Sequence, residues 1–233
     1  MINWRVFQIE ETPSTNILAK CGRPGDVFCA DFQTAGRGRL DHKWLSTKGK
    51  NLMMSVVLDV SGNDPHEVAT FPLVVGLAVI TALKRYALDL KLKWPNDILA
   101  SDKKLAGILC ERNNDSLIAG LGVNILERSF PAEIAARATS LAILGAKTVI
   151  CDVRDSILEE ISRYYEIWSK DGFRSLWKHF VAIDYLKGRE VQIFEQDDAL
   201  PAAAGICSGI QENGTLLVNN VQIWAGEAHV KLG

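Results

Sequence analysis

The sequence lacks the features that mark several large classes of protein. Its five cysteines are scattered and include no Cys-x-x-Cys pair. This argues against a disulfide framework or a zinc site and favours buried thiols in a reducing compartment. Lys and Arg total 26 against 28 Asp and Glu, for a formal net charge of −2. There is therefore no basic excess of the kind that a dedicated nucleic-acid surface shows.

Long hydrophobic runs are also missing. The uncharged segment 68–83 is interrupted by Pro72 and is shorter than the roughly 18 apolar residues that a membrane-spanning helix needs, so it predicts a buried helix. Arg5, Glu10 and Glu11 interrupt the N-terminal segment where a signal peptide would have its apolar core. The sequence predicts a cytoplasmic protein that does not enter a membrane.

The two best-known nucleotide motifs are absent, because no Gly-Lys is followed by Ser or Thr and no three-glycine fingerprint links a strand to a helix. Segment 36–39 instead reads Gly-Arg-Gly-Arg. Glycines let backbone amides approach a phosphate closely, and arginines supply bidentate donors for its oxygens. Taken alone, this run is at least as consistent with a solvated surface loop as with a phosphate site. Together with Lys-Trp-Pro-Asn-Asp at 93–97 and Lys104, it suits the binding of a nucleotide triphosphate.

The hydrophobic pattern predicts an α+β domain at 1–186 and a small β-barrel or meander at 187–233. Strands are expected at 27–31, 52–60, 90–94, 105–111 and 117–124. The last three are expected to pair antiparallel, because their connections are short. Helices are expected at 15–21, at 152–168 behind Asp152 as N-cap, and at 173–181. Beyond 187, strands are expected at 190–194, 203–210, 215–218 and 227–232, with Asn213-Gly214 and Asn219-Asn220 as turns.

Several segments resemble the biotin protein ligases in both order and spacing. They are Ser14-Thr15-Asn16, residues 33–39, Trp44, residues 93–97, residues 104–109, and Gly122-Val123-Asn124, with Gly205, Gly209, Gly214 and Gly226-Glu227 near the C-terminus. The resemblance covers nearly the whole chain. It implies an α+β fold with a mixed, largely antiparallel sheet, in a class II synthetase-like catalytic domain, followed by a small barrel of the Src-homology-3 kind.

The resemblance also implies a two-step reaction. Biotin and ATP give biotinyl-5'-adenylate, and a lysine of a biotin carboxyl carrier domain then displaces AMP. Biotin, ATP and Mg²⁺ are the expected ligands, with Mg²⁺ held mainly by ATP phosphates. Because a carboxylate must attack an anionic phosphate, positioning and positive charge can carry the first step without an enzyme nucleophile.

The resemblance assigns site residues position by position. The biotin-binding set is Ser14, Thr15, Asn16, Gln33, Arg37, Gly38, Arg39, Lys104 and Gly107. The ATP-binding set is Arg37, Arg39, Trp44, Asn96, Lys104 and Asn124. Lys104, Arg39 and Asp97 are the catalytic candidates, with Asp97 either helping to bind metal or activating the incoming amine. Simpler explanations remain for single residues: Trp44 or Trp94 as core, Ser14-Thr15 as a helix cap, and Lys104 as part of a solvated charge cluster.

Two departures from the family pattern affect the loop and the C-terminus. Asp41 stands where the family usually has glycine and His42 where it has arginine, although Lys43 keeps a permanent charge beside them. Lys231 stands where some relatives have arginine. A role of His42 near the pyrophosphate and a contribution of Lys231 to the nucleotide site are therefore both open.

Other functions compete with that of a biotin protein ligase. The 13 residues before Ser14 are too few for the winged-helix domain of the repressor relatives, so we expect a monofunctional ligase that does not bind DNA. The alternatives are a lipoate-type protein ligase and a non-catalytic biotin or nucleotide sensor. The expected partner is the carrier domain of a biotin-dependent carboxylase, and a homodimer is left open.

Overall fold

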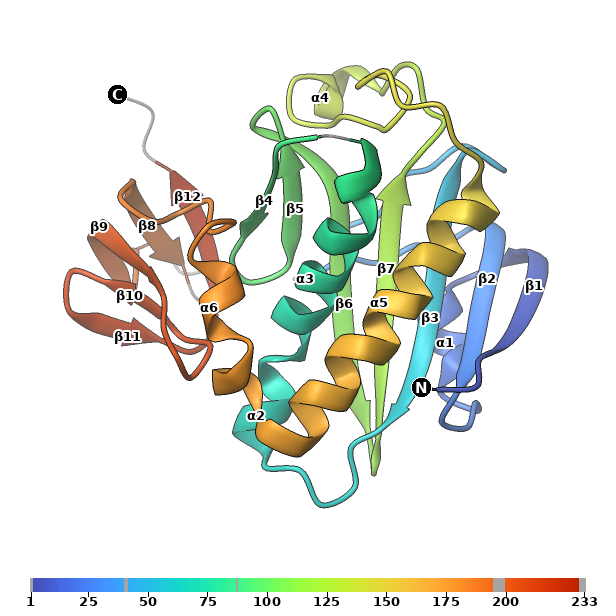
Figure 1. The fold of residues 1–233 in the computed structure, drawn as a ribbon. Helices are drawn as coiled ribbons and strands as arrows, with labels where there is room; N and C mark the ends of the chain where they lie inside the picture. The colour runs from blue at the N-terminus through green and yellow to red at the C-terminus, as the bar shows by residue number, and fades with distance from the viewer. Residues whose placement is uncertain (1, 40–41, 87, 195–199, 231–233) are drawn as a thin grey trace.

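The structure is a computed structural model that describes residues 2–39, 42–86, 88–194 and 200–230. A seven-stranded sheet forms its centre (Figure 1). In spatial order its strands are β1 (Arg5–Thr12), β2 (Asp26–Gln33), β3 (Asn51–Asp59), β7 (Ser116–Asn124), β6 (Lys103–Asn113), β5 (Asp97–Ala100) and β4 (Leu90–Lys93). Only the β1–β2 pair is parallel, which confirms the predicted mixed, largely antiparallel sheet.

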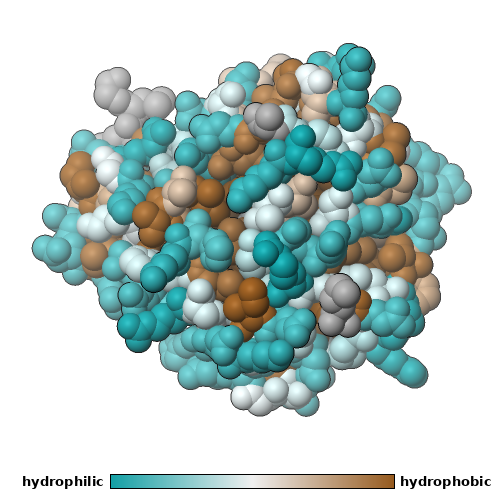
Figure 2. Space-filling view, in the orientation of Figure 1, coloured by the Kyte–Doolittle hydropathy of each residue, from teal (hydrophilic) through white to brown (hydrophobic). Residues whose placement is uncertain are grey.

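Two long helices cover one face of this sheet. Figure 1 shows α3 (Phe71–Leu83) and α5 (Ile150–Asp171) lying across it side by side. The predicted buried helix is confirmed as α3, and Pro72 lies in its first turn, where the missing amide costs nothing. Helix α5 buries one stripe against the core, made of Val153, Ile157, Leu158, Ile161, Tyr164 and Trp168. The face over these helices is mainly hydrophilic in Figure 2.

Three details of the helices differ from expectation. Asp152 is not the N-cap of α5, because the helix begins at Ile150 and Asp152 lies in its first turn, where a negative charge still suits the helix dipole. The helix predicted at 173–181 is divided into a 3-10 turn (η2, Phe173–Ser175) and α6 (Trp177–Phe180). The helix predicted at 15–21 is the shorter α1 (Thr15–Ala19). The remaining helical turns are α2 (Pro65–Ala69), η1 (Lys84–Tyr86) and α4 (Ala132–Ala135).

A smaller antiparallel sheet follows, as expected for the C-terminal β domain. Its strands lie in the order β11 (Val221–Ile223), β10 (Leu216–Val218), β9 (Ala203–Ile210), β8 (Glu190–Phe194) and β12 (Glu227–Val230). Trp94, which follows β4, donates from Nε1 to Gly214 O at 3.2 Å and so ties the large sheet to the smaller one. Trp177 Nε1 donates to Ile210 O at 2.7 Å and ties α6 to β9. The boundary at residue 186 stays a prediction. No helix in the described ranges has the length and apolar character to cross a bilayer.

The second face of the large sheet carries α1 and a glycine-rich loop. Side chains of β7 alternate across the sheet: Leu121 and Val123 join the core under the helices, whereas Gly120 and Gly122 meet Asn16 and Trp44 on the opposite side. This face, which the long helices leave free, is where the predicted site residues gather.

Candidate active site

A cavity of about 500 Å³ opens on this face, between the large sheet, the loop 36–44 and strand β12 of the smaller sheet. Its lining includes every residue that the sequence predicted for the site: Ser14, Thr15, Asn16, Gln33, Arg37, Gly38, Arg39, Trp44, Asn96, Asp97, Lys104, Gly107 and Asn124. Thirteen residues from six segments of the sequence therefore meet at one cavity, although the sequence offered only their order and spacing. Their individual roles stay predictions.

The described residues of the loop 36–44, which are 36–39 and 42–44, pair as the two arms of a small hairpin at the cavity. Trp44 N donates to Gly36 O at 3.0 Å and Gly38 N donates to His42 O at 2.6 Å, and Arg37 and Lys43 form an antiparallel bridge. Asp41, whose role was open, lies outside the described residues. The hairpin brings the arginines of the loop to the rim of the cavity.

Glycines on β6 and β7 form the floor under Trp44. A Cβ atom at Gly122 would lie 2.4 Å from Trp44 Cε2, and one at Gly107 would lie 3.2 Å from Trp44 Cζ3. Any larger residue would therefore push the indole away. Trp44 Nε1 is buried and has no hydrogen-bond partner within the described part of the chain. A buried, unpaired donor is costly, so this atom is a candidate contact for a ligand.

Hydroxyl and amide groups line one end of the cavity. Gln33 Oε1 accepts hydrogen bonds from Thr15 N at 2.7 Å and from Thr15 Oγ1 at 3.0 Å. Ser55 Oγ donates to Asn16 Oδ1 at 2.6 Å. Ser14 is buried and occupies the N-cap position of α1, yet its side chain makes no capping hydrogen bond. The simple explanation of Ser14 as a helix cap therefore fails, and its hydroxyl is left to the cavity.

Cations and carboxylates alternate at the other end. Lys104 Nζ lies 2.7 Å from Asp97 Oδ1 and 5.8 Å from the centre of the Trp44 ring. The Lys104–Asp97 contact is an ion pair without well-directed hydrogen-bond geometry, since Asp97 Oδ1 is buried and has no hydrogen-bond partner among the residues described. Arg39 Nη1 donates to Gly226 O at 3.1 Å. Burial lowers the pKa of Arg39, and Glu227 and Asp97 partly oppose this.

Two charged residues of this end lie in segments that the sequence singled out, but they were not among the assigned site residues. Lys93 lines the cavity, and its burial lowers its pKa; Asp97 and Glu227 oppose the shift, while Lys104 adds to it. The alternation of β4 was an available signal, because Leu90 and Leu92 are buried and Lys93 belongs to the opposite face. Glu227 belongs to the Gly226-Glu227 pair of the resemblance, which gave it no role at the site; β12 brings it to the loop from the far end of the chain.

Other predicted residues have partners of their own. Asn96 Nδ2 donates to Ile108 O at 2.8 Å and Asn124 Nδ2 donates to Thr139 O at 3.0 Å, so both amides help to hold the cavity wall. His42 Nε2 lies 3.8 Å from Glu227 Oε2, with 71% of its side chain exposed. Lys43 is exposed at the rim. Lys231 lies outside the described residues.

The charge pattern suits an anionic ligand more than a metal site made by the protein. No group of three or more His, Cys, Asp and Glu that could hold a metal ion occurs in the described ranges. The described lining has six positive side chains and three negative ones, an excess of three positive charges: Arg37, Arg39, Lys43, Lys93, Lys104 and Arg137 against Asp97, Asp102 and Glu227. The cavity thus offers polar partners at one end and cations at the other, which fits a ligand that joins a small polar ring to phosphates.

Known proteins match both the sequence and the fold. Residues 11–125 match the family model of the biotin/lipoate A/B protein ligases. The solved structure of a biotin protein ligase from Aquifex aeolicus, in complex with biotin and ATP, has a TM-score of 0.86 and 30% identity, and the alignment covers 98% of this chain and 99% of that one.

Two curated relatives extend these matches. The biotin–[acetyl-CoA-carboxylase] ligase of Mycobacterium tuberculosis (strain H37Rv) is 35% identical over 153 residues, which is 61% of this chain and 57% of the relative. The bifunctional ligase/repressor BirA of Escherichia coli (strain K12) is 26% identical over 233 residues, which is 95% of this chain and 71% of the relative.

Proposed function

The chain belongs to the biotin protein ligases within the biotin/lipoate A/B protein ligase family, and we propose that it joins biotin to a protein lysine at the expense of ATP. One observation carries the proposal: a polar end with Thr15, Asn16 and Gln33 and a cationic end with Arg39 and Lys104 share one cavity of about 500 Å³. Biotin's ureido ring needs hydrogen-bond partners when buried, whereas its carboxylate and the triphosphate need positive charge.

In the first step, a carboxylate oxygen of biotin attacks the α-phosphorus of ATP. A new P–O bond forms, the bond to the β-phosphate bridge breaks, and pyrophosphate leaves with the electron pair. Both reactants are anions, so the barrier contains like-charge repulsion that fixed cations reduce. We assign this task to Lys104 and Arg39, with Lys93 as a third cation on the same wall.

In the second step, the amine nitrogen of an acceptor lysine attacks the carbonyl carbon of the mixed anhydride. An amide bond forms, the carbon–oxygen bond to the phosphate breaks, AMP leaves, and the nitrogen loses a proton. Lys104 stabilises the developing negative charge again. Asp97 lies 2.7 Å from Lys104 Nζ and orients it. The predicted roles of Asp97 in metal binding or amine activation stay predictions.

Mg²⁺ enters this scheme with the triphosphate. The described carboxylates of the cavity, Asp97, Asp102 and Glu227, lie beside cations and do not form a metal cage of their own. Bound to ATP, the ion would supply neutralising charge to the phosphate oxygens. The steps assigned to Lys104, Arg39 and Asp97 do not depend on its position.

The acceptor is a lysine of the carrier domain of a biotin-dependent carboxylase. The relatives' names favour biotin over lipoate, and the paired cations Arg39 and Lys104 favour catalysis over sensing. The absence of DNA binding and a cytoplasmic location remain predictions of the sequence, and a homodimer is still left open.

Incubation of the chain with biotin, MgATP and a purified carrier domain tests the proposal. We expect the carrier to gain the mass of one biotinyl group, and a carrier whose acceptor lysine is replaced by arginine to gain none. Transfer of lipoate in place of biotin would contradict the proposed substrate.

A further inference from the structure

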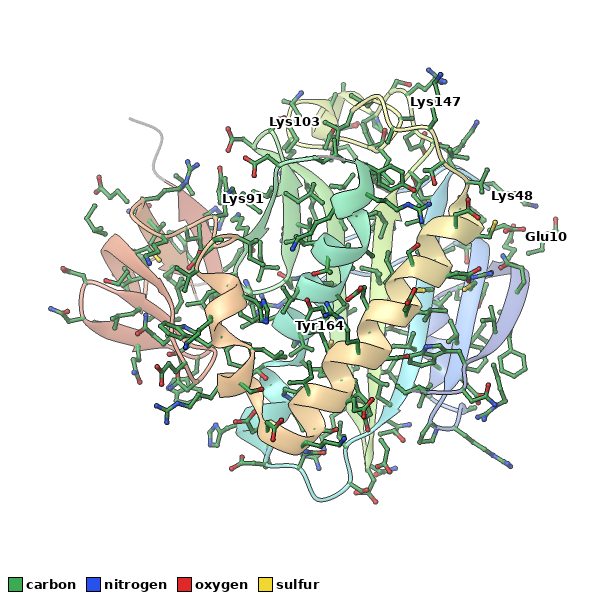
Figure 3. All side chains as sticks on the ribbon, in the orientation of Figure 1. Glu10, Lys48, Lys91, Lys103, Lys147 and Tyr164 are labelled. Atoms are coloured by element: carbon green, nitrogen blue, oxygen red, sulfur yellow. The ribbon has the colours of Figure 1, made fainter. Side chains whose placement is uncertain are left out.

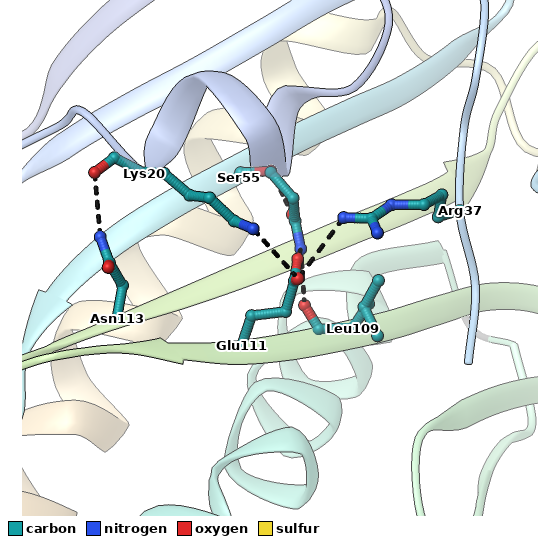
Figure 4. Close-up of polar contacts among 7 residues, drawn as sticks. Lys20, Arg37, Ser55, Leu109, Glu111 and Asn113 are labelled. Atoms are coloured by element: carbon teal, nitrogen blue, oxygen red, sulfur yellow. Dashed lines mark hydrogen bonds and ion pairs between the residues drawn. The ribbon is translucent and has the colours of Figure 1, made fainter. Parts of the chain in front are cut away.

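A carboxylate behind the cavity wall joins the biotin end to the loop. Glu111 lies on β6, outside every motif that predicted the site, and its side chain is 26% exposed. Its Oε2 accepts a hydrogen bond from Asn16 Nδ2 at 2.6 Å, and its Oε1 lies 3.4 Å from Arg37 Nη2 and 3.8 Å from Lys20 Nζ. Figure 4 shows Lys20 and Arg37 reaching this carboxylate from opposite sides.

The contact with Glu111 fixes how the Asn16 amide is turned. A carboxylate can only accept, so the NH₂ group of Asn16 must face Glu111. Nδ2 also lies 3.3 Å from Leu109 O, and Oδ1 accepts from Ser55 Oγ. The amide is buried, and a Cβ at Gly120 would lie 2.1 Å from Asn16 Oδ1, so the amide packs directly against this glycine. Ser55 Oγ also contacts Thr15 Oγ1 at 2.7 Å, which carries the fixed orientation to the next polar group of the cavity.

The second contact reaches the loop 36–44. Arg37 belongs to the hairpin at the cavity, and its guanidinium is drawn to Glu111 across 74 positions of sequence. Arg37 and Asn16 both line the cavity, whereas Glu111 does not. The carboxylate therefore acts on a bound ligand only through these two neighbours.

We propose that Glu111 is a positioning residue for biotin: it sets the Asn16 amide for the ureido end, and it holds Arg37 in place at the cavity. We call the Glu111–Arg37 contact the latch. This inference rests on the proposed function. The ion pair is partly exposed, with 45% of the Arg37 side chain accessible, so its effect is moderate. We expect the charge of Glu111 to slow biotin dissociation about fivefold, which corresponds to about 1 kcal/mol.

Biotin dissociation from the full chain tests the latch. Labelled biotin is bound without ATP, and its release is followed after a chase of unlabelled biotin. Glu111→Gln keeps an acceptor for Asn16 but removes the charge, so release should be about fivefold faster. In an Arg37→Gln background the same change should have almost no further effect, because the latch is already lost. Lys20→Gln is the matched control: it removes the other cation near Glu111 and should leave release unchanged.

A second variant separates the two contacts. Glu111→Ala also removes the acceptor for the buried Asn16 Nδ2, so biotin affinity should fall about tenfold or more whether residue 37 is Arg or Gln. Glu111→Gln should recover most of this loss. Added salt should speed release from the unmodified protein more than it speeds release from Glu111→Gln, because only the unmodified protein has the Glu111–Arg37 ion pair to screen. A purely structural role would lower the melting temperature without changing release from the folded protein.

The outcomes distinguish this inference from the function on which it rests. If the unmodified chain binds no biotin, the proposed function fails. If it binds biotin and Glu111→Gln releases it at the original rate, or if the Gln effect is equally large with and without Arg37, the latch is refuted.

Discussion

Replacement of Lys104 by alanine separates catalysis from stability. The Lys104 ammonium is 2.7 Å from Asp97 Oδ1. Because 39% of the Lys104 side chain and 21% of the Asp97 side chain are exposed, solvent screens the pair. Pairs of this kind contribute about 1 kcal/mol or less to the free energy of unfolding, which for a chain of this size shifts the melting temperature by roughly 2–4 °C. In the transition state the same ammonium faces developing charge, where loss of one electrostatic donor costs about 10²–10³ in rate, or about 2.7–4 kcal/mol.

Single-turnover formation of biotinyl-adenylate measures this rate directly. The neighbouring Lys103 gives the matched control, because it is exposed at the start of β6 and its side chain is labelled at the edge of the molecule in Figure 3. We expect Lys103→Ala to form adenylate at the original rate. Adenylation by Lys104→Ala within about threefold of the unmodified protein would refute the assignment of Lys104.

Three further predictions concern the other walls of the cavity. Arg39→Gly removes the guanidinium that now donates to Gly226 O, so the intermediate should escape faster and label lysines of bystander proteins; an adenylate lifetime equal to the original would place the holding role elsewhere. Gly122→Ala places a Cβ 2.4 Å from Trp44, so the KM for ATP should rise at least about tenfold while biotin affinity stays nearly unchanged; loss of both would show that the floor itself has collapsed. Burial lowers the pKa of Lys93, so Lys93 should lose its charge, and ATP binding should weaken, at a lower pH than for an ordinary lysine. Lys93→Arg should move this loss of ATP binding to higher pH, and superimposable profiles of KM against pH from 7 to 10 would contradict the prediction.

The fold was predictable where the pattern was strong. Strands β8 and β9 begin and end at the predicted residues, and Asn219 and Asn220 both have positive φ, as the predicted hairpin turn requires. Strand β1 was missed because six of its eight residues are exposed and no apolar face marks it. Strand β5 was missed because Asn96-Asp97 after Pro95 is also a turn signal, and only pairing with β4 and β6 makes it a strand.

The candidate site was likewise predictable only in part. The motifs predicted which residues line the cavity, because each motif carries its chemistry in a few adjacent positions. They did not predict the contacts between Arg39 and the Gly226 carbonyl, between His42 and Glu227, or between Arg37 and Glu111. These partners are far apart in sequence, and no local pattern specifies which strand returns to face the loop.

Biotin-dependent exchange of labelled pyrophosphate into ATP tests the central claim most directly, because it reports reversible formation of the adenylate without any carrier protein. The account predicts that exchange requires biotin and that lipoate does not replace it. Exchange supported by lipoate and not by biotin, or tight biotin binding without any exchange, would contradict the claim that this chain is a biotin-activating ligase.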